Sequence, residues 1–178
     1  PPSPDPVLLF LGSVYGANLE AAIYMARRIW PCVREGVPSA RLIIAGISKS
    51  MLDGGVHDTP GVEVPGFVES LDGLYAASRA VVTPILVGGG TRFKIIEAGA
   101  YGRPVVSTTV GMEGIDLTPG SEIIVRDDPR EFASACVELL IDGALSERIG
   151  LAAREKAAAR YDRRAVVKNI RQRIASAL

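Results

Sequence analysis

The sequence predicts an α/β protein with one doubly wound parallel sheet of about six strands, helices on both faces and extra helices at its C-terminal end. Two observations lead to this prediction. Short apolar runs of strand length alternate with longer segments whose apolar residues recur at helical spacing, which is the order of βαβ units. Runs such as residues 42–45 are apolar without alternation, as in strands that are buried on both faces of a sheet.

Each element has its own signal. The expected strands are residues 7–11, 41–45, 62–64, 80–83, 104–107 and 122–125. The expected helices are residues 18–35, 71–77, 92–101, 129–141, 144–160 and 162–178. Leu19, Ile23 and Ala26 give the first helix its apolar spacing, and Asp128 is a predicted N-cap. Gly102 and Pro104 stop the helix at residues 92–101.

The composition limits the cellular compartments and the kinds of binding partner that can be expected. The 178 residues suit one domain, and the formal net charge of zero gives no bulk attraction to nucleic acid. Cys32 and Cys136 fall in predicted helices, so a reducing compartment is expected. No apolar run is long enough to span a bilayer, and no signal peptide is visible. We expect a cytoplasmic protein, with the inner face of the membrane as a second option.

The two ends of the chain differ in character. Residues 1–6 are rich in proline, which is typical of a linker from a preceding domain, so residues 7–160 are predicted to be the domain and the chain a piece of a longer protein. Residues 144–178 hold nine Lys or Arg and three Asp or Glu, a net of +6. This basic tail suits a solvated helix face, or else contact with a partner domain or an anionic membrane.

The most informative segment is the glycine run at residues 88–90, which leads into the helix at residues 92–101 with Thr91 as its predicted N-cap. Arg92 and Lys94 lie in the first turn, where the helix dipole disfavours cations by roughly 0.3–1 kcal/mol each. Glycine backbone, a helix N-terminus and two cations together suit an anion such as a phosphate. The alternative is a flexible surface loop. Neither a dinucleotide fingerprint nor a P-loop motif is present.

Other candidate residues have plain structural interpretations beside the functional ones. Glu97 lies three residues after Lys94 on the same helical face, so it forms either a surface pair or an acceptor for ribose hydroxyls. His57 is the only histidine and falls in a polar loop, where a solvated side chain is expected. Glu113 and Asp116 follow a strand at the ligand-binding end of such a sheet, although acidic residues are also common in turns.

The sequence GGGTRFKIIEA at residues 88–98, followed by GRPVVSTTVGMEG at residues 102–114, resembles the C-terminal half of retaining GT-B glycosyltransferases of group 1, also called family four. The segments FLGS at residues 10–13, RLIIAG at residues 41–46, VEVPGFV at residues 62–68 and DDP at residues 127–129 fit the same pattern. The resemblance covers nearly the whole chain and implies a Rossmann-like domain that forms one half of a GT-B fold.

The resemblance also implies roles for individual residues. Glu97 matches the glutamate that holds the ribose hydroxyls, and the backbone at Gly90, Thr91 and Arg92 matches the diphosphate-binding turn. The predicted donor-binding residues are Gly12, Ser13, Gly88, Gly89, Gly90, Thr91, Arg92, Lys94 and Glu97. Gly111, Met112 and Glu113 are predicted to form a further loop of the donor pocket.

The chain departs from the family pattern at three positions. The first glutamate of that pattern, which contacts the donor sugar, is replaced by Gly89. Ser13 and Asn18 stand where many members carry an Arg and a Lys that neutralise the diphosphate. Our hypothesis is that Arg92 and Lys94 stabilise the diphosphate instead. Positions two apart lie on different helix faces, and alignment with Glu97 favours Lys94 as the contact.

The resemblance implies transfer of a sugar from a nucleoside diphosphate to an acceptor hydroxyl with retention. No cofactor is expected, and the sequence shows no metal-ligand spacing. The acceptor site would belong to an N-terminal domain of the same protein, so this chain alone is expected to be inactive, with residues 161–178 packing on that domain. Two alternatives remain, a degenerate nucleotide-sugar-binding or interaction module and a GT-B-like nucleotide-sugar epimerase.

Overall fold

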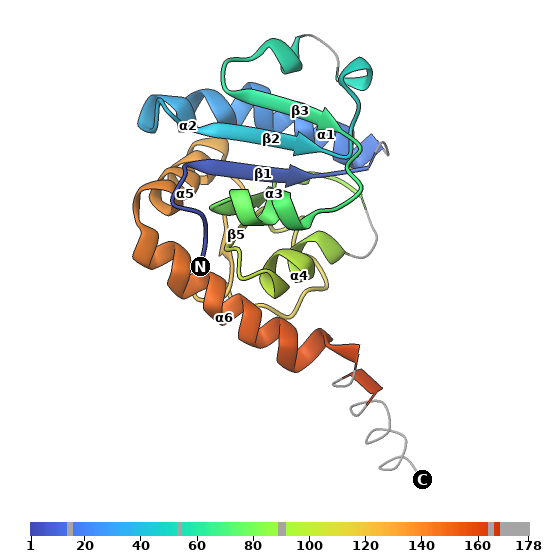
Figure 1. Ribbon diagram of the computed structural model, residues 1–178, viewed down its shortest axis with the longest axis vertical. Coiled ribbons are helices and arrows are strands. Elements are labelled where there is room, and N and C mark those ends of the chain that lie inside the picture. Colours follow the sequence, from blue (N-terminus) through green and yellow to red (C-terminus); the bar gives the residue numbers. More distant parts are fainter. Residues whose placement is uncertain (14–15, 53–54, 89–91, 164–165, 168–178) are drawn as a thin grey trace.

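The computed structural model describes residues 1–13, 16–52, 55–88, 92–163 and 166–167. These residues form a six-stranded parallel sheet in the order β3-β2-β1-β4-β5-β6, flanked by helices (Figure 1). The strands are β1 (Val7–Leu11), β2 (Arg41–Ala45), β3 (Val62–Gly66), β4 (Ala80–Thr83), β5 (Val105–Ser107) and β6 (Ile124–Val125). The predicted fold class and the strand positions are therefore confirmed, with ends that differ by one or two residues.

The centre of the sheet is β1, which pairs with β2 on one side and β4 on the other. Leu8 lies opposite Leu42 in β2 and opposite Ala80 in β4. All five residues of β1 are buried, as the unbroken apolar run predicts. The edge strand β3 instead alternates between buried and exposed residues, and its exposed Glu63 accepts a 2.6 Å hydrogen bond from Arg41. The strands β2 and β3 follow one another on one side of β1, and the strands β4, β5 and β6 follow one another on its other side, so the strand order reverses between β1 and β4.

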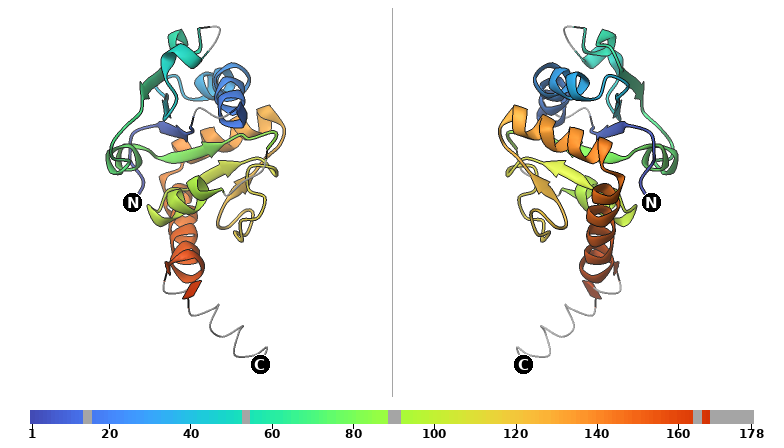
Figure 2. Two further views of the ribbon diagram at one scale, coloured as in Figure 1. Left: turned by 90° about the vertical axis from the view of Figure 1, so that its right-hand side faces the viewer. Right: turned by 90° about the vertical axis from the view of Figure 1, so that its left-hand side faces the viewer.

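The two faces of the sheet are covered by different helices (Figure 2). One face carries α1 (Gly16–Tyr24), α2 (Trp30–Gly36) and α5 (Pro129–Ile141), and its core includes Phe10, Trp30 and Phe132. The other carries α3 (Asp72–Ala77) and α4 (Phe93–Ala100), and its core includes Tyr75 and Ile95. Helix α6 (Gly143–Tyr161) packs along α4, and its Ile149 belongs to the first core. The short helices η2 (Lys49–Met51) and η3 (Val56–Asp58) lie in the connection between β2 and β3.

The prediction of one uninterrupted α-helix over residues 18–35 is wrong in its middle. A π-helical turn, η1 (Met25–Ile29), separates α1 from α2, and the N–H of Trp30 donates to the carbonyl of Met25. Pro31 follows in the first turn of α2. Proline has no N–H to donate and its ring clashes with the preceding turn, so the chain widens before it and restarts the helix there.

The helix ends agree in part with the sequence analysis. Asp128 caps α5 as predicted, because its carboxylate accepts hydrogen bonds from the N–H groups of Arg130 and Glu131 at 2.8 and 3.1 Å. The N-cap residue of α4 is Arg92 and not the predicted Thr91, and the Arg92 side chain makes no capping hydrogen bond. Thr91 lies outside the described residues. Most of the helix predicted at 162–178 also lies outside them.

The proline-rich residues 1–6 lie against the domain. Arg79 donates to the carbonyl of Ser3 at 2.8 Å, and Arg103 donates to the carbonyl of Pro1 at 2.5 Å. The N–H of Ser3 donates in turn to the carbonyl of Ser78 at 3.3 Å. Two arginines of the folded domain therefore fix the path of this segment.

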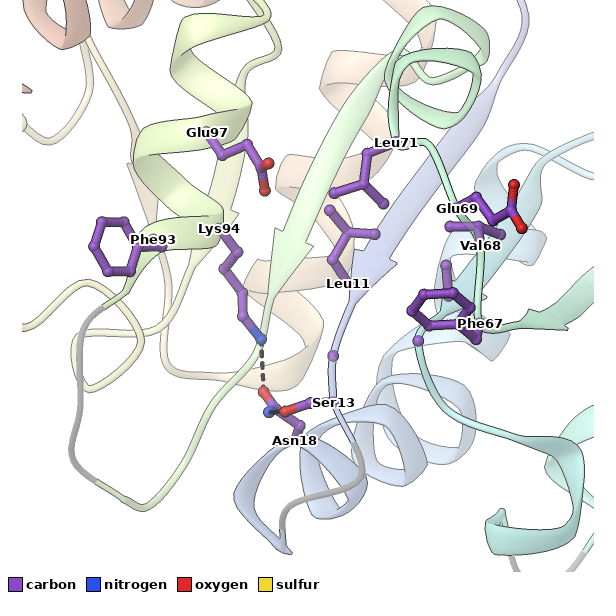
Figure 3. A pocket seen from close by; sticks show the side chains of 13 residues that line it. Leu11, Ser13, Asn18, Phe67, Val68, Glu69, Leu71, Phe93, Lys94 and Glu97 are labelled. Atoms are coloured by element: carbon purple, nitrogen blue, oxygen red, sulfur yellow. Dashed lines mark hydrogen bonds between the residues drawn. The ribbon is translucent and has the colours of Figure 1, made fainter. Parts of the chain in front are cut away.

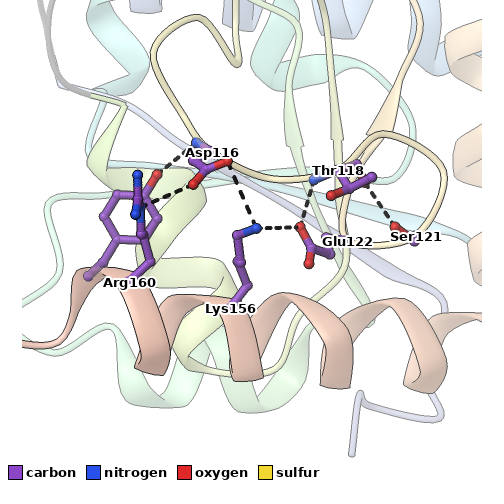
Figure 4. A network of polar contacts seen from close by, with 7 residues as sticks. Asp116, Thr118, Ser121, Glu122, Lys156 and Arg160 are labelled. Atoms are coloured by element: carbon purple, nitrogen blue, oxygen red, sulfur yellow. Dashed lines mark hydrogen bonds and ion pairs between the residues drawn. The ribbon is translucent and has the colours of Figure 1, made fainter. Parts of the chain in front are cut away.

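Basic residues of α6 contact the loop between β5 and β6 (Figure 4). Lys156 lies 3.9 Å from Asp116 and 3.8 Å from Glu122, and Arg160 lies 3.1 Å from Asp116. The hydroxyl of Tyr161 accepts a 2.7 Å hydrogen bond from the N–H of Asp116. This part of the basic tail is thus paired within the domain.

Across the described residues, no helix has the length and apolar character needed to cross a bilayer.

Helices α4 and α6 pack at backbone distance. A Cβ atom on Gly150 would stand 2.2 Å from the carbonyl oxygen of Gly102, and a Cβ on Gly99 would stand 3.2 Å from that of Ala153. The smallest side chain is therefore required at Gly150, and this contact fixes the position of α4 against α6.

We predict that Gly150→Ala lowers the free energy of unfolding by about 1–3 kcal/mol, because the added methyl group forces α6 away from Gly102. Urea denaturation measures the change. Gly73→Ala is the matched control, since a Cβ on this α3 glycine meets no atom within 4 Å. The control should be neutral or stabilising by about 0.4–1 kcal/mol. Equal destabilisation by both substitutions would contradict the prediction.

Candidate functional site

A cavity of about 530 Å³ opens at the carboxyl ends of β1, β2 and β3 (Figure 3). Helix α4 forms the opposite wall, and Asn18 of α1 closes one end. The lining residues are Leu11, Gly12, Ser13, Asn18, Ala45, Gly46, Phe67, Val68, Glu69, Leu71, Phe93, Lys94 and Glu97. Ligands of doubly wound sheets bind at this edge, and the volume lies in the range of small-molecule sites.

Backbone rather than side chains forms part of this lining. Gly46 has φ +86°, and a Cβ there would stand 2.1 Å from the carbonyl oxygen of Gly12. A Cβ on Gly12 would stand 2.8 Å from the ring of Phe10. Both strand ends therefore require glycine, and a ligand can approach their main chain closely.

Lys94 supplies the cation of the cavity. Its ammonium Nζ donates a 2.6 Å hydrogen bond to Oδ1 of Asn18, whose amide donates to the hydroxyl of Ser13 at 3.2 Å (Figure 3). The same Nζ lies 5.3 Å from the centre of the Phe10 ring. The structure thus places Lys94 beside Ser13 and Asn18. These are the two positions where many family members carry a cation, and Lys94 is the residue expected to supply the missing charge.

Among the residues that the structure describes, no carboxylate neutralises the charge of Lys94. No ion pair to it is found among the described residues, and its hydrogen-bond acceptor Asn18 is neutral. Burial, and then the charge of Arg92, lower the pKa of Lys94 from 10.5 to about 8. The negative charge of an anion in the cavity would stabilise the charged form of Lys94 and raise its pKa again.

Arg92 has a different environment. Its side chain does not line this cavity and is only 7% exposed. Its Nη2 donates to the carbonyl of Gly88 at 2.7 Å and to that of Val110 at 3.2 Å. Arg92 therefore ties the start of the glycine run to the loop after β5. Of the two cations proposed to stabilise a diphosphate, the geometry favours Lys94, one helical turn from Glu97.

Glu97 is half-buried and lines the cavity on the turn of α4 after Lys94. The hydroxyl of Tyr75 donates a 3.1 Å hydrogen bond to its Oε2. Lys94 bonds to Asn18 instead of Glu97, so the two charged side chains do not form the surface pair that their spacing allowed. A cation and a carboxylate thus line the same cavity independently of each other (Figure 3).

The glycine run is described only at its start. Gly88 has φ +109°, and a Cβ there would stand 3.1 Å from the Cβ of Ala17, so the run begins beside the first turn of α1. Gly89, Gly90 and Thr91 lie outside the described residues. Their predicted role at the diphosphate stays a prediction.

The predicted loop at Gly111, Met112 and Glu113 does not line this cavity. The N–H of Gly111 donates to the hydroxyl of Thr108 at 2.9 Å, and a Cβ on Gly111 would stand 2.5 Å from Oγ of Ser107. Crowding therefore explains this glycine without a ligand. His57 lies in η3, 3.5 Å from Asp58 and away from the cavity lining.

Sequence reasoning missed the aromatic residues of the site. Phe67 and Phe93 line the cavity mouth while 85% and 67% exposed, and Tyr75 is fully buried behind Glu97. Phe67 stands within a segment that resembles the family, which was an available signal. The contact of Tyr75 with a residue 22 positions away leaves no local pattern. Within the described ranges, His, Cys, Asp and Glu side chains form no cluster of three or more that could hold a metal ion.

Solved structures share this fold. HepE from Anabaena, in complex with UDP and glucose, aligns with a TM-score of 0.77 and 17% identity over 97% of this chain and 48% of that one. Sucrose-phosphate synthase from Thermosynechococcus elongatus aligns with 0.76 and 20% identity over 98% of this chain and 46% of its own. The C-terminal domain of LpcC, a glycosyl transferase group 1 family protein from Francisella tularensis, aligns with 0.66 and 15% identity over 90% of this chain and 87% of that domain.

A curated relative and a family model also match the sequence of this chain. An uncharacterized 44.6 kDa protein in the cps region of Klebsiella pneumoniae is 26% identical over 135 residues. Those residues cover 71% of this chain and 35% of the relative, so the chain spans about a third of that protein and about half of HepE. The model of the family described as Glycosyl transferases group 1 matches residues 5–142, and the chain belongs to that family.

Proposed function

We propose that this domain binds the nucleoside diphosphate part of a sugar donor for a glycosyltransferase that retains anomeric configuration. The observation that carries the proposal is the pair formed by Lys94 and Glu97, which line one cavity from consecutive turns of α4. A cation suits a diphosphate, and a carboxylate suits the vicinal hydroxyls of a ribose. The cavity lies at the reversal point of the sheet, where nucleotides bind in such folds.

The remaining walls suit the rest of a nucleotide. Val68, Leu71 and the exposed ring of Phe67 give the cavity an apolar wall. A flat base can lie against such a surface, while the diphosphate lies toward Lys94 and the backbone of Gly12. The complex of Anabaena HepE with UDP supports this class of ligand.

The chemistry proposed for the domain is electrostatic. When the bond between the sugar and the diphosphate breaks, the diphosphate oxygen keeps the electron pair and negative charge develops on it. Lys94 and the N-terminus of α4 would stabilise this charge in the departing group. Glu97 would hold the ribose in place and take no part in bond breaking. Acceptor binding is proposed to lie in the rest of the full-length protein.

Lys94 also accounts for the two unusual polar positions. Asn18 and Ser13 stand where many family members carry cations, and the Lys94 ammonium lies 2.6 Å from Asn18 Oδ1. We infer that Lys94 places one positive charge, from α4, near the position at which those cations would stand. The neutral Asn18 and Ser13 orient this ammonium without cancelling its charge.

Titration with UDP, GDP and ADP tests the function directly. One nucleotide should bind, and Glu97→Ala should weaken it by about 10- to 100-fold, because a hydrogen bond to a charged group contributes about 1.5–3 kcal/mol. Calorimetry measures the affinity. Glu155→Ala, which removes an exposed carboxylate from α6, should leave it unchanged. Absence of binding of all three nucleotides at millimolar concentration would favour a degenerate module instead.

Lys94→Met should weaken binding of that nucleotide by about 10-fold or more, since a charge-assisted contact to the diphosphate is lost. The corresponding nucleoside, which has no phosphate, should bind the variant and the unaltered protein equally. Arg148→Met removes one exposed charge from α6 and controls for the change in net charge. Equal affinity of the Lys94→Met and unaltered proteins for the diphosphate would refute the role.

The affinity for the nucleoside diphosphate should fall as the pH rises through about 8. In the free domain Lys94 loses its proton around this pH, whereas the diphosphate, with a last pKa near 6, stays fully ionised. Binding then requires uptake of a proton, which becomes less favourable as the pH increases. Calorimetry between about pH 7 and 9.5 in buffers of different ionisation enthalpy measures this uptake. The Lys94→Met protein should show none, and a flat profile for the unaltered protein would contradict the prediction.

A further inference from the structure

Tyr75 of α3 is the residue behind Glu97. It is 0% exposed, and its hydroxyl donates to Oε2 of Glu97 at 3.1 Å. Tyr75 itself does not line the cavity, so a ligand there would touch the carboxylate and not the phenol. Any effect of Tyr75 on a ligand therefore passes through Glu97.

The direction of this hydrogen bond is fixed. An ionised carboxylate only accepts, so the phenol must donate. Burial, and then the negative charge of Glu97, raise the pKa of Tyr75 well above its ordinary value of 10. The phenol keeps its proton at every pH at which the protein would be studied. It occupies one acceptor position of Oε2, so Oε1 and the second position of Oε2 are left for a ligand.

The phenol is also held rigidly. Its ring stacks on that of Tyr101, with centroids 4.2 Å apart and an angle of 12° between the planes. The hydroxyl of Tyr101 donates to Asp72, in the first turn of α3. Tyr75 also belongs to the core that includes Ile95 and Ala98 of α4. These contacts hold the phenol of Tyr75 against α4, the helix that carries Glu97.

We propose that Tyr75 is a positioning residue that holds Glu97 in the conformation needed to accept hydrogen bonds from both ribose hydroxyls. This inference rests on the proposed function of the cavity. A free glutamate side chain samples several rotamers and loses that freedom when a ligand binds. The hydrogen bond from Tyr75 restricts the carboxylate before binding, so the domain distinguishes a ribose from a sugar without these hydroxyls.

The experiment uses the whole 178-residue chain and whichever of UDP, GDP and ADP binds it. Tyr75→Phe keeps the stacked ring and removes the hydroxyl. It should weaken binding of the nucleotide by about 3- to 10-fold. The 2′,3′-dideoxy analogue should bind Tyr75→Phe and the unaltered protein with equal affinity, to within about twofold. In a Glu97→Ala background, Tyr75→Phe should have no further effect on the ribonucleotide. Tyr161→Phe, which removes a hydroxyl bonded to the N–H of Asp116 away from the cavity, should leave both affinities unchanged.

The outcomes separate this inference from the function on which it rests. If Glu97→Ala weakens the ribonucleotide and Tyr75→Phe does not, the positioning role is overturned while the proposed function stands. Equal weakening of the ribonucleotide and the dideoxy analogue by Tyr75→Phe, or further weakening in the Glu97→Ala background, would show a general structural effect and also overturn the role. If no nucleotide binds, both proposals fall.

Discussion

Pairing of β1 with strands on both of its sides is the constraint from which the arrangement of the site follows. Because β2 and β4 occupy its two edges, the chain must reverse the direction of strand addition there. The loops that leave β1 and β4 then turn to opposite faces of the sheet and leave an opening between them. Gly12 and Gly46 keep the floor of this opening free of side chains. Burial of β1 on both faces thus stabilises the fold and also determines where a ligand can approach the backbone.

Helix α4 joins this opening to the core. Ile95 and Ala98 face the sheet, Gly99 packs on α6, and Lys94 and Glu97 face the cavity. The positions of the last two are set from outside the helix, by Asn18 for the lysine and by Tyr75 for the glutamate. Two neutral partners thereby keep opposite charges apart on one helix face. Direct pairing of these charges would have neutralised the site.

The local features of the fold could be predicted from the sequence, and the long-range contacts of the site could not. Strands such as Val7–Leu11, the Asp128 cap and the glycine-led helix follow from patterns within a few residues. Pro31 was visible, but its effect depends on whether the chain ends the helix or widens it into a π-turn. Ser13, Lys94 and Glu97 were found by motif. Asn18 was found through the family resemblance, but its hydrogen bond to Lys94, which spans 76 residues, was not. Tyr75 was missed altogether, because its bond to Glu97 spans 22 residues and hydrophobic spacing does not record such a contact.

The lowered pKa of Lys94 also affects the folded domain when no ligand is present. The unfolded chain binds this proton more tightly than the folded domain, so the stability contributed at this position increases as the pH rises from about 8 toward 10.5. At neutral pH the domain therefore retains a cation that opposes folding. Selection for thermal stability without nucleotide would favour an apolar side chain at position 94, and the variants that fold best would be those that had lost the charge of the site.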